Sequence, residues 1–554
     1  MQYSSRRWIH LPLYAIPLLV AFRVFNALSI KTFFQPDEYW QSLEPAHIAV
    51  YGYGYLTWEW REHLRSAAHP LLFAGVYKLA NWLDIDPVLG PKLFQGVVAA
   101  IGDIYTYELA IQATNTPSAS VAKLALFANL ASAFNWFCLP RTFSNSLETV
   151  LTTIALSYWP WKSFTSGSPI IWPRFVLSLA IASIACIFRP TNALLWLFLG
   201  IHFLWTSSSS RQTTVKIIAA TSAVLTLSLC FNGLVDYVYF GEPVFPLLNF
   251  IKFNIVESLS QFYGVNQWHY YLSQGLPLLT MAYLPLVLTG LYQYKSTIIV
   301  QLILFIIGSY SLLAHKEVRF IFPLIPLLHL LVAAALDRIR RRAIFPLPYL
   351  VAILLAINVP VATYFSLYHQ RGVIDVISYL RHEPTVSSVG FLMPCHSTPW
   401  QSHIHRPDIT AWFLTCEPPL GLTAKQQKSY LDIADQFYAD PTTFLDTHFP
   451  PLDDAPTDTP PSHSDYDWPS HLVFFAALEP LASRYLSPVY QEVSSFFPGA
   501  GASGGWGSAP DPAAPLAALE SFSSTVLAIS CEAGATGSGA EPQPPEAPWP
   551  PDTV

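Results

Sequence analysis

Two adjacent carboxylates, Asp37 and Glu38, stand in a polar and aromatic segment between two apolar runs. This segment, residues 30–70, is called the first loop segment, and its other candidate substrate-binding residues are Gln35, Tyr39, Trp58, Glu59 and Arg65. Trp and Tyr rings prefer the headgroup level of a membrane, and carboxylates near membrane depth are costly enough to indicate a function. The segment is therefore either a site that acts on a polar group carried by a lipid or a surface helix with an aromatic anchor.

The adjacency of the two carboxylates favours sugar transfer over sugar hydrolysis. If they begin a helix, their side chains diverge by about 100°, so one can face a reaction centre while the other holds structure. Inverting glycosyl transfer needs a single general base to take the proton of an acceptor hydroxyl. Retaining hydrolysis needs two carboxyl groups about 5 Å apart, which neighbours on one helix seldom provide.

A second charged group, His315-Lys316-Glu317-Val318-Arg319, stands at the beginning of an apolar run. Arg grips phosphate oxygens bidentately and stabilises the charge that develops on a leaving phosphate. These side chains are therefore candidates for contact with a lipid phosphate. The alternative for Lys316 and Arg319 is interfacial anchoring by long cationic side chains.

Further ionisable and polar residues lie within apolar surroundings. Asn145 and Glu148, in the segment Arg141–Glu148, are three residues apart and share a helical face. Asp103 stands inside an apolar run, and Arg189-Pro190-Thr191 follows another. Buried ionisable residues in spans pair with one another or line a cavity, so Asp103, Asn145 and Glu148 either contact substrate or fix helix packing.

Composition predicts an all-α polytopic membrane protein with about ten to twelve transmembrane helices. Of the 554 residues, 52% are hydrophobic and 12% charged, against about 25% charged in soluble domains. The net charge of −7 gives no sign of nucleic-acid binding, and no nucleotide-binding or metalloprotease motif occurs. Arg6 and Arg7 precede an apolar run that we interpret as an uncleaved signal anchor.

Basic clusters predict the topology and three regions. The N-terminal arginines and the cluster at Arg338–Arg342 are expected in the cytoplasm, which places the first loop segment and the His315–Arg319 turn on the far side. Residues 1–368 are predicted to form the multi-span domain. Residues 369–496 are predicted to form a membrane-associated segment on the far side, and residues 497–554 a low-complexity, disordered tail.

Two cysteines of the second region, Cys395 and Cys416, are candidates for a disulfide in an oxidising compartment. His396, His403 and His405 lie between them, so a zinc site is the alternative, although the spacing matches no standard zinc pattern.

Several of these segments together resemble glycosyltransferase family 22. They are Phe34–Glu44 (FQPDEYWQSLE), Tyr53–Trp60 (YGYLTWEW), Arg141–Glu148 (RTFSNSLE) and His315–Phe320 (HKEVRF), and Pro394–Pro399 (PCHSTP) adds support for one branch of the family. The resemblance implies a GT-C fold in the endoplasmic reticulum membrane, with a lumenal active site and membrane lipids around it. It also implies inverting transfer of mannose from dolichol-phosphate-mannose, without a nucleotide cofactor or a metal.

The branch resembled implies the acceptor and the residue roles. The acceptor is a GPI precursor that already bears two mannoses, and the new linkage is α-1,2. Asp37 matches the acidic catalytic position and Glu38 supports it, while His315, Lys316, Glu317 and Arg319 match the conserved turn. No protein partner is implied.

Other functions stay open from the sequence. Within the same chemistry they are an α-mannosyltransferase of lipid-linked N-glycan assembly or the fourth GPI mannosyltransferase; in other classes, a lipid transporter or flippase, or a non-catalytic subunit. Transporters commonly show internal repeats with polar residues at mid-membrane on broken helices. The first loop segment has no repeat in the second half of the chain, which favours an enzyme.

Overall fold

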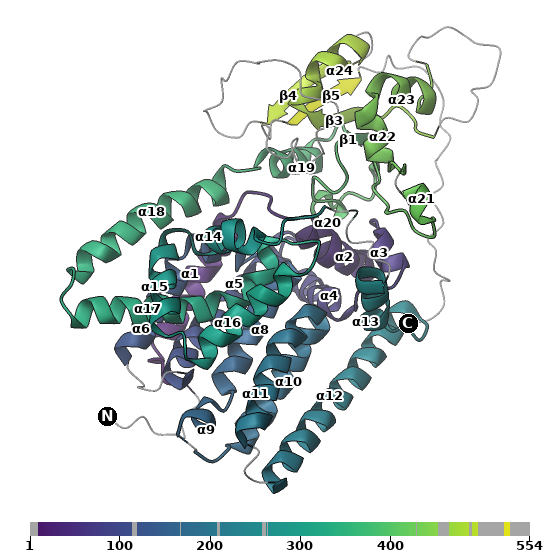
Figure 1. Cartoon of the computed structure of the whole chain (residues 1–554). Coiled ribbons are helices and arrows are strands. Elements are labelled where there is room, and N and C mark those ends of the chain that lie inside the picture. The colour runs from purple at the N-terminus through teal and green to yellow at the C-terminus, as the bar shows by residue number, and fades with distance from the viewer. Residues whose placement is uncertain are drawn as a thin grey trace.

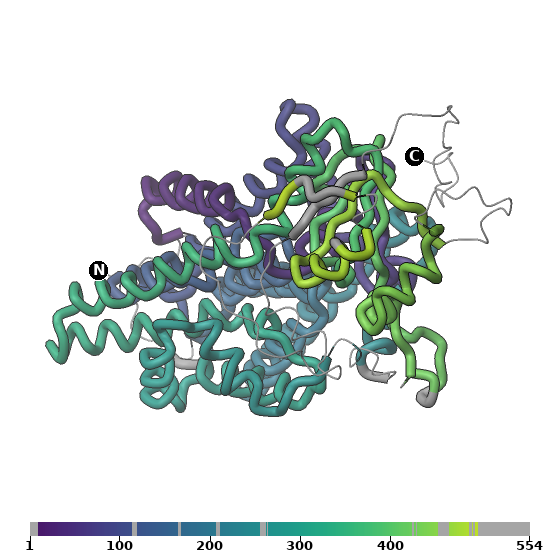
Figure 2. Tube along the Cα trace, turned by 90° about the horizontal axis from the view of Figure 1, so that it is seen from above, coloured from purple at the N-terminus to yellow at the C-terminus, as the bar shows by residue number. Residues whose placement is uncertain are grey.

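The computed structural model describes residues 9–113, 119–166, 168–207, 211–256, 262, 264–427, 429–451, 465–486, 490–496 and 526–531. A bundle of helices makes up most of this chain, and a smaller α/β unit lies at one end of it (Figure 1). Seen along the perpendicular direction, the α/β unit covers one side of that end, and α18 extends away from it (Figure 2).

The bundle is built mainly from the following helices: α1 (Ala15–Ser29), α4 (Ala68–Trp82), α5 (Leu89–Ala113), α6 (Ala119–Leu130), α7 (Ala133–Cys138), α8 (Ser144–Tyr158), α9 (Trp161–Ser166), α10 (Trp172–Phe188), α11 (Ala193–Ser207), α12 (Arg211–Phe240), α13 (Pro246–Ile251), α14 (Leu276–Thr280), α15 (Leu284–Gln293), α16 (Ile298–Ser311), α17 (Ile325–Arg341) and α18 (Leu347–Leu367). A single large core of apolar side chains joins them.

Four helical stretches of the described chain are long and apolar enough to cross a membrane: Arg211–Phe240, Tyr271–Gln293, Val318–Arg341 and Leu347–His382. Shorter apolar helices accompany them at Ala15–Ser29, Ala119–Leu130, Trp172–Phe188 and Ile298–Ser311. The count of ten to twelve spans therefore stays a prediction.

Two long apolar runs of the sequence are each split into two helices. The run Phe175–Trp205 is divided between α10 and α11 by a 3-10 turn at Pro190–Asn192, because proline has no N–H for the helical ladder. The run Val121–Cys138 is divided between α6 and α7, where Ser132 caps α7 by accepting a hydrogen bond from the N–H of Asn135.

The first loop segment contains a helix with a widened section. A π-helical section, Tyr39–Leu43, runs into α2 (Glu44–Tyr51), and α3 (Trp58–Arg61) follows. Pro45 has no N–H to donate to the carbonyl one turn earlier. The N–H of the preceding Glu44 bonds to the carbonyl of Tyr39, which is the wider spacing of a π-helix. Such π-helical sections occur often at functional sites.

The all-α prediction is wrong for the C-terminal region, which contains a five-stranded sheet. The strands are β1 (Ser388–Leu392), β2 (Thr410–Phe413), β3 (His471–Phe475), β4 (Tyr490–Phe496) and β5 (Val526–Cys531), in the order β2-β1-β3-β5-β4. β1 is parallel to β2 and β3, with Val389 opposite His471, while β5 is antiparallel to β3 and β4. The rest of the α/β unit consists of α19 (Gly372–His382), α20 (Gln401–Ile404), α21 (Ala424–Gln427), α22 (Ile433–Ala439), α23 (Pro441–His448) and α24 (Glu479–Leu486).

Strand β5 lies beyond the predicted start of the tail, and the boundaries of the three regions stay predictions. Its residues lie inside 497–554, the region predicted to be disordered, yet they pair with both neighbouring strands. The other residues of that prediction lie outside the described chain.

The first loop segment and the α/β unit share one core. Apolar side chains of the former pack with those of the latter, among them Phe33, Tyr39, Trp40, Leu43, Val389, Phe391, Trp400 and Phe413. The helix that carries the two candidate carboxylates is therefore held in place by packing against the α/β unit as well as by its own segment.

Candidate active site

Asp37 lies in the first turn of the helix that continues into α2, and its carboxylate forms an ion pair with the guanidinium of Arg319. Pro36 precedes it, and the carbonyl of Pro36 accepts the N–H groups of Tyr39 and Trp40. The N-terminal end of a helix favours a negative charge. The structure thus brings the first loop segment and the His315–Arg319 turn together, although they lie far apart in the sequence.

Arg319 belongs to a chain of charges that runs along its own turn. Its Nε and one terminal nitrogen each lie 2.7 Å from an oxygen of Glu317, and Glu317 Oε1 lies 3.1 Å from His315 Nε2. Burial alone would raise the pKa of Glu317, but the Arg319 charge and the His315 hydrogen bond hold that pKa well below its ordinary value. Burial likewise would lower the pKa of His315, and its bond to Glu317 raises it instead. Glu317 is therefore ionised and orients Arg319 toward Asp37.

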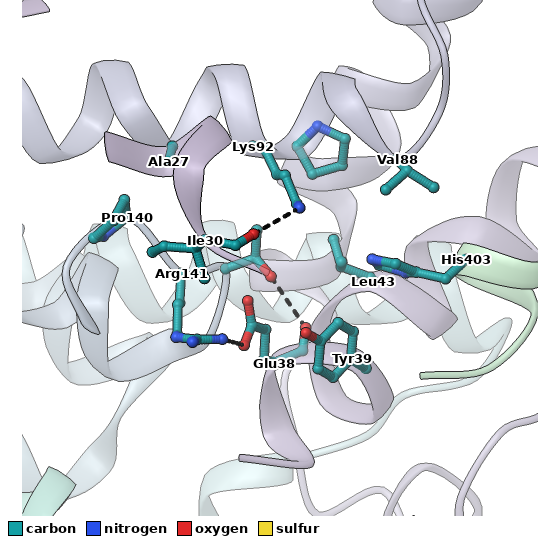
Figure 3. A pocket seen from close by; sticks show the side chains of 12 residues that line it. Ala27, Ile30, Glu38, Tyr39, Leu43, Val88, Lys92, Pro140, Arg141 and His403 are labelled. Atoms are coloured by element: carbon teal, nitrogen blue, oxygen red, sulfur yellow. Dashed lines mark hydrogen bonds and ion pairs between the residues drawn. The ribbon is translucent and has the colours of Figure 1, made fainter. Parts of the chain in front are cut away.

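Glu38 has a different environment from its neighbour, as expected from their divergence on a helix. Its Oε2 accepts a hydrogen bond of 2.9 Å from Arg141, whose guanidinium also donates to the carbonyl and hydroxyl oxygens of Thr32. Thr142 donates its hydroxyl proton to the Glu38 carbonyl at 3.1 Å. Figure 3 shows Glu38 and Arg141 side by side in a pocket that is also lined by Lys92 and His403. Glu38 therefore fixes the helix in place.

Glu59 lies in a polar group of the first loop segment. It accepts a hydrogen bond of 2.9 Å from Gln41, accepts another from the hydroxyl of Thr57, and lies 3.9 Å from Arg65. Its neighbour Trp58 is buried against Phe253, with ring centroids 5.2 Å apart.

Asn145 and Glu148, from the first turns of α8, connect the Arg319 turn to the end of α10. Asn145 donates to Glu148 at 3.1 Å and to the Arg319 carbonyl at 3.4 Å, and Asn192 donates to the other Glu148 oxygen at 2.8 Å. The two polar residues that share a helical face thus join one network beside Arg319.

Other predicted residues lie apart from this group. Asp103 is fully buried and pairs with Arg23 and Asn129, as a network fixing helix packing would. The ammonium group of Lys316 donates a hydrogen bond of 2.8 Å to the carbonyl of Asn266. Tyr39 is buried between Phe33 and His403.

Gln35 contributes its carbonyl, which accepts the N–H of Glu38 at 3.2 Å and so fixes the first helical turn. Its half-buried side chain stays a predicted substrate contact.

Cys395 and Cys416 form a disulfide, with Cα atoms 5.7 Å apart. His396 lies next to it, with Nδ1 at 3.9 Å from Cys416 Sγ, whereas His403 packs on Tyr39 and His405 bonds to His47. Among the described residues, the three histidines therefore do not gather around the two sulfurs as the zinc alternative requires.

Arg141 and Arg189 stand beside apolar runs without a role that the sequence assigns, and the structure brings both to this region. The signal was present, because both are arginines beside apolar runs, but their partners lie far away in sequence. Together the residues supply a buried carboxylate, Asp37, beside a cation, Arg319, at the end of the helical bundle that faces the α/β unit. This arrangement suits proton abstraction next to a group that develops negative charge.

Residues 14–405 match the family described as the Alg9-like mannosyltransferase family. The chain is 49% identical to GPI mannosyltransferase 3 of Yarrowia lipolytica, over 83% of this chain and 88% of that protein. It is 37% identical to GPI alpha-1,2-mannosyltransferase 3 of Mus musculus, over 87% of this chain and 85% of that protein. Among solved structures, ArnT from Cupriavidus metallidurans bound to undecaprenyl phosphate superposes with a TM-score of 0.54 at 12% identity, over 95% of this chain and 99% of the other.

Proposed function

Because the chain belongs to the Alg9-like mannosyltransferase family, we propose that it transfers the third mannose of the GPI anchor in α-1,2 linkage. The donor is dolichol-phosphate-mannose, and the acceptor is a GPI precursor that bears two mannoses. Support for this acceptor comes from the similarity to relatives named GPI mannosyltransferase 3 over most of both chains.

One observation carries the chemical part of the proposal: the buried Asp37 carboxylate paired with Arg319. Asp37 takes the proton of the acceptor hydroxyl while that oxygen attacks the sugar carbon of the donor. The bond between this carbon and the phosphate oxygen breaks, and the phosphate leaves with the electron pair, which inverts the sugar carbon. No nucleotide and no metal enter these steps.

The ion pair couples the two halves of the reaction. Before reaction, Arg319 holds the Asp37 carboxylate in place. As the leaving phosphate gains negative charge, it competes with Asp37 for Arg319, which frees the carboxylate to take the proton of the acceptor.

The same family relationship supports a proposal for the location. We place the enzyme in the endoplasmic reticulum membrane with Asp37 on the lumenal side, where the sugar of the donor and the GPI precursor meet. Its partners are these two glycolipids and the surrounding membrane lipids.

The test is Asp37→Asn in the full-length enzyme, assayed with dolichol-phosphate-mannose and the two-mannose precursor. Loss of the base lowers turnover by about 10²–10⁴-fold, with unchanged abundance in the membrane. Glu62→Gln is the matched control, because this exposed carboxylate lies in the same segment. Near-normal turnover of Asp37→Asn would exclude Asp37 as the base. Wild-type enzyme that uses an N-glycan precursor instead would exclude the GPI acceptor.

A further inference from the structure

Arg189 is a buried arginine whose guanidinium has no hydrogen bond or ion pair with any residue in the described part of the chain. It follows the last residue of α10, and only 9% of its surface is exposed. Its guanidinium carbon lies 5.6 Å from the ring centre of Phe320. Because buried charges are normally paired, this group needs an anion.

The surroundings of Arg189 place it at the active site. Arg319 lies on the same ring, with its guanidinium carbon 5.9 Å from the centre of Phe320. The strongest electrostatic neighbours of Arg189 are Glu148, Arg319, Arg65 and Asp37. The cation therefore stands beside the Asp37–Arg319 pair, at the lumenal end of the bundle that the proposed function assigns.

The other cations of this region already have partners. Arg319 uses its nitrogens on Glu317 and Asp37, and Lys316 donates to the Asn266 carbonyl. Arg189 is therefore a further cation, beyond the residues of the His315–Arg319 turn, that could contact a phosphate. Arg65 Nε is also buried without a hydrogen-bond partner among the described residues, and Arg65 lies 3.9 Å from Glu59 at its other end.

We propose that Arg189, assisted by Arg65, binds the phosphate of the lipid-linked sugar donor. The identity of the donor rests on the proposed function, whereas the need for an anion comes from the unpaired buried guanidinium. A phosphate of the acceptor lipid has similar chemistry. The donor phosphate is favoured because it is bonded to the reacting sugar carbon and must lie near Asp37.

Binding of a short-chain polyprenyl phosphate tests this assignment without any transfer reaction. The ligand raises the unfolding temperature of the full-length wild-type enzyme in detergent by mass action, whereas the matching polyprenol without phosphate does not. A charge-assisted hydrogen bond contributes about 1.5–3 kcal/mol, so Arg189→Ala needs about 10–100 times more ligand for the same shift. Arg189→Lys gives an intermediate value because it keeps the charge and loses the bidentate fork. Arg174→Ala, at the other end of α10, behaves as wild type.

Steady-state assays separate the two possible sources of phosphate. Arg189→Ala raises KM for the donor by about 10–100-fold and leaves KM for the acceptor unchanged. A rise confined to the acceptor KM would overturn the assignment. A second result would also overturn it. If Arg189→Ala lowers the unfolding temperature without ligand but leaves the rise caused by polyprenyl phosphate unchanged, the arginine has a purely structural role. A third outcome is a wild type that fails to transfer mannose to the two-mannose precursor and still binds polyprenyl phosphate through Arg189. That result would refute the proposed acceptor, and the assignment of Arg189 as a phosphate-binding residue would stand.

Discussion

Asp37 and Glu38 are adjacent in sequence but have opposite environments. Asp37 is paired with Arg319, which belongs to a turn at the entrance of a long apolar helix. Glu38 is paired with Arg141, which is almost fully buried and also satisfied by Thr32. The roughly 100° turn between neighbours on a helix therefore separates a group suited to chemistry from a group that holds the helix.

The difference predicts that Glu38→Gln mainly lowers stability. It removes the charge that compensates Arg141, and breaking a buried ion pair costs about 3–5 kcal/mol. We expect a lower unfolding temperature and lower abundance in the membrane, measured by thermal unfolding in detergent. Asp37→Asn should keep both near wild type, because Arg319 retains Glu317 as a carboxylate partner. A Glu38→Gln enzyme of normal stability without transfer activity would instead identify Glu38 as the base.

At the scale of residues, the sequence predicts the groups of the site better than their pairing. Asp37 and Arg319 could be predicted because carboxylates and cations beside apolar runs are costly without a function. The pairs Glu38–Arg141 and Asp37–Arg319 depend on how distant helices pack, and neither local pattern nor spacing encodes that packing. The sequence marks Arg189 only as a charge after an apolar run, since its environment is made by Phe320 and α8 from other parts of the chain.

At the scale of elements, the helix of Asp37 is attached to the α/β unit through Trp40. The indole of Trp40 donates to the carbonyl of Thr398 at 2.9 Å, and its ring lies 4.5 Å from His396 and 5.7 Å from Trp400. These contacts come from the loop after β1, which the disulfide ties to the segment after β2. The loop and the disulfide thus position the helix that carries Asp37.

We therefore expect Cys395→Ser to lower stability and to weaken transfer. A disulfide that closes a loop of this size, with a sequence separation of 21, contributes about 3 kcal/mol. The measurement is thermal unfolding together with kcat, each with and without a reductant. Wild type should lose stability in the reductant, and the variant should not respond to it. Cys230→Ser is the control, because this free cysteine is exposed on α12; an equal effect of both substitutions would contradict the assigned role.

The sequence predicts the helices of the bundle and misses the sheet for a physical reason. Long apolar runs are a local signal, and helices satisfy their backbone within one segment. The strands are short, as in Thr410–Phe413, and β3 pairs with β1 across about 80 residues. Their stability comes from non-local pairing and a shared core, so segments of four to seven residues among prolines and polar residues could equally be loops.

Across the whole molecule, a pair formed by the buried His47 and the half-buried His405 joins the first loop segment to the α/β unit. His47 Nδ1 lies 3.0 Å from the Tyr53 carbonyl, which can only accept, so Nδ1 carries the proton. His47 Nε2 is therefore the acceptor of the 3.0 Å bond from His405 Nδ1. A second proton on His47 must enter at Nε2, where it meets that N–H and forces the bond to break or reverse.

The pair predicts that acid loosens the contact between the two parts. Burial lowers the pKa of His47 from 6.5 to about 4, so the unfolded chain binds the proton more readily than the folded chain between these values. The stabilisation is complete above about pH 6.5 and is lost as the pH falls toward 4. The unfolding temperature of the full-length enzyme in detergent should therefore fall between pH 7 and pH 5.

His47→Gln isolates this contribution, because glutamine can donate to the Tyr53 carbonyl and accept from His405 but does not titrate. The variant should show a shallower fall between pH 7 and pH 5 than wild type. The fall should not vanish, since burial also lowers the pKa of His403. His382→Gln, exposed at the end of α19, should keep the wild-type slope. If His47→Gln and wild type lose stability in parallel, the acid-sensitive contact lies elsewhere, and the histidine pair joins the two parts without responding to pH.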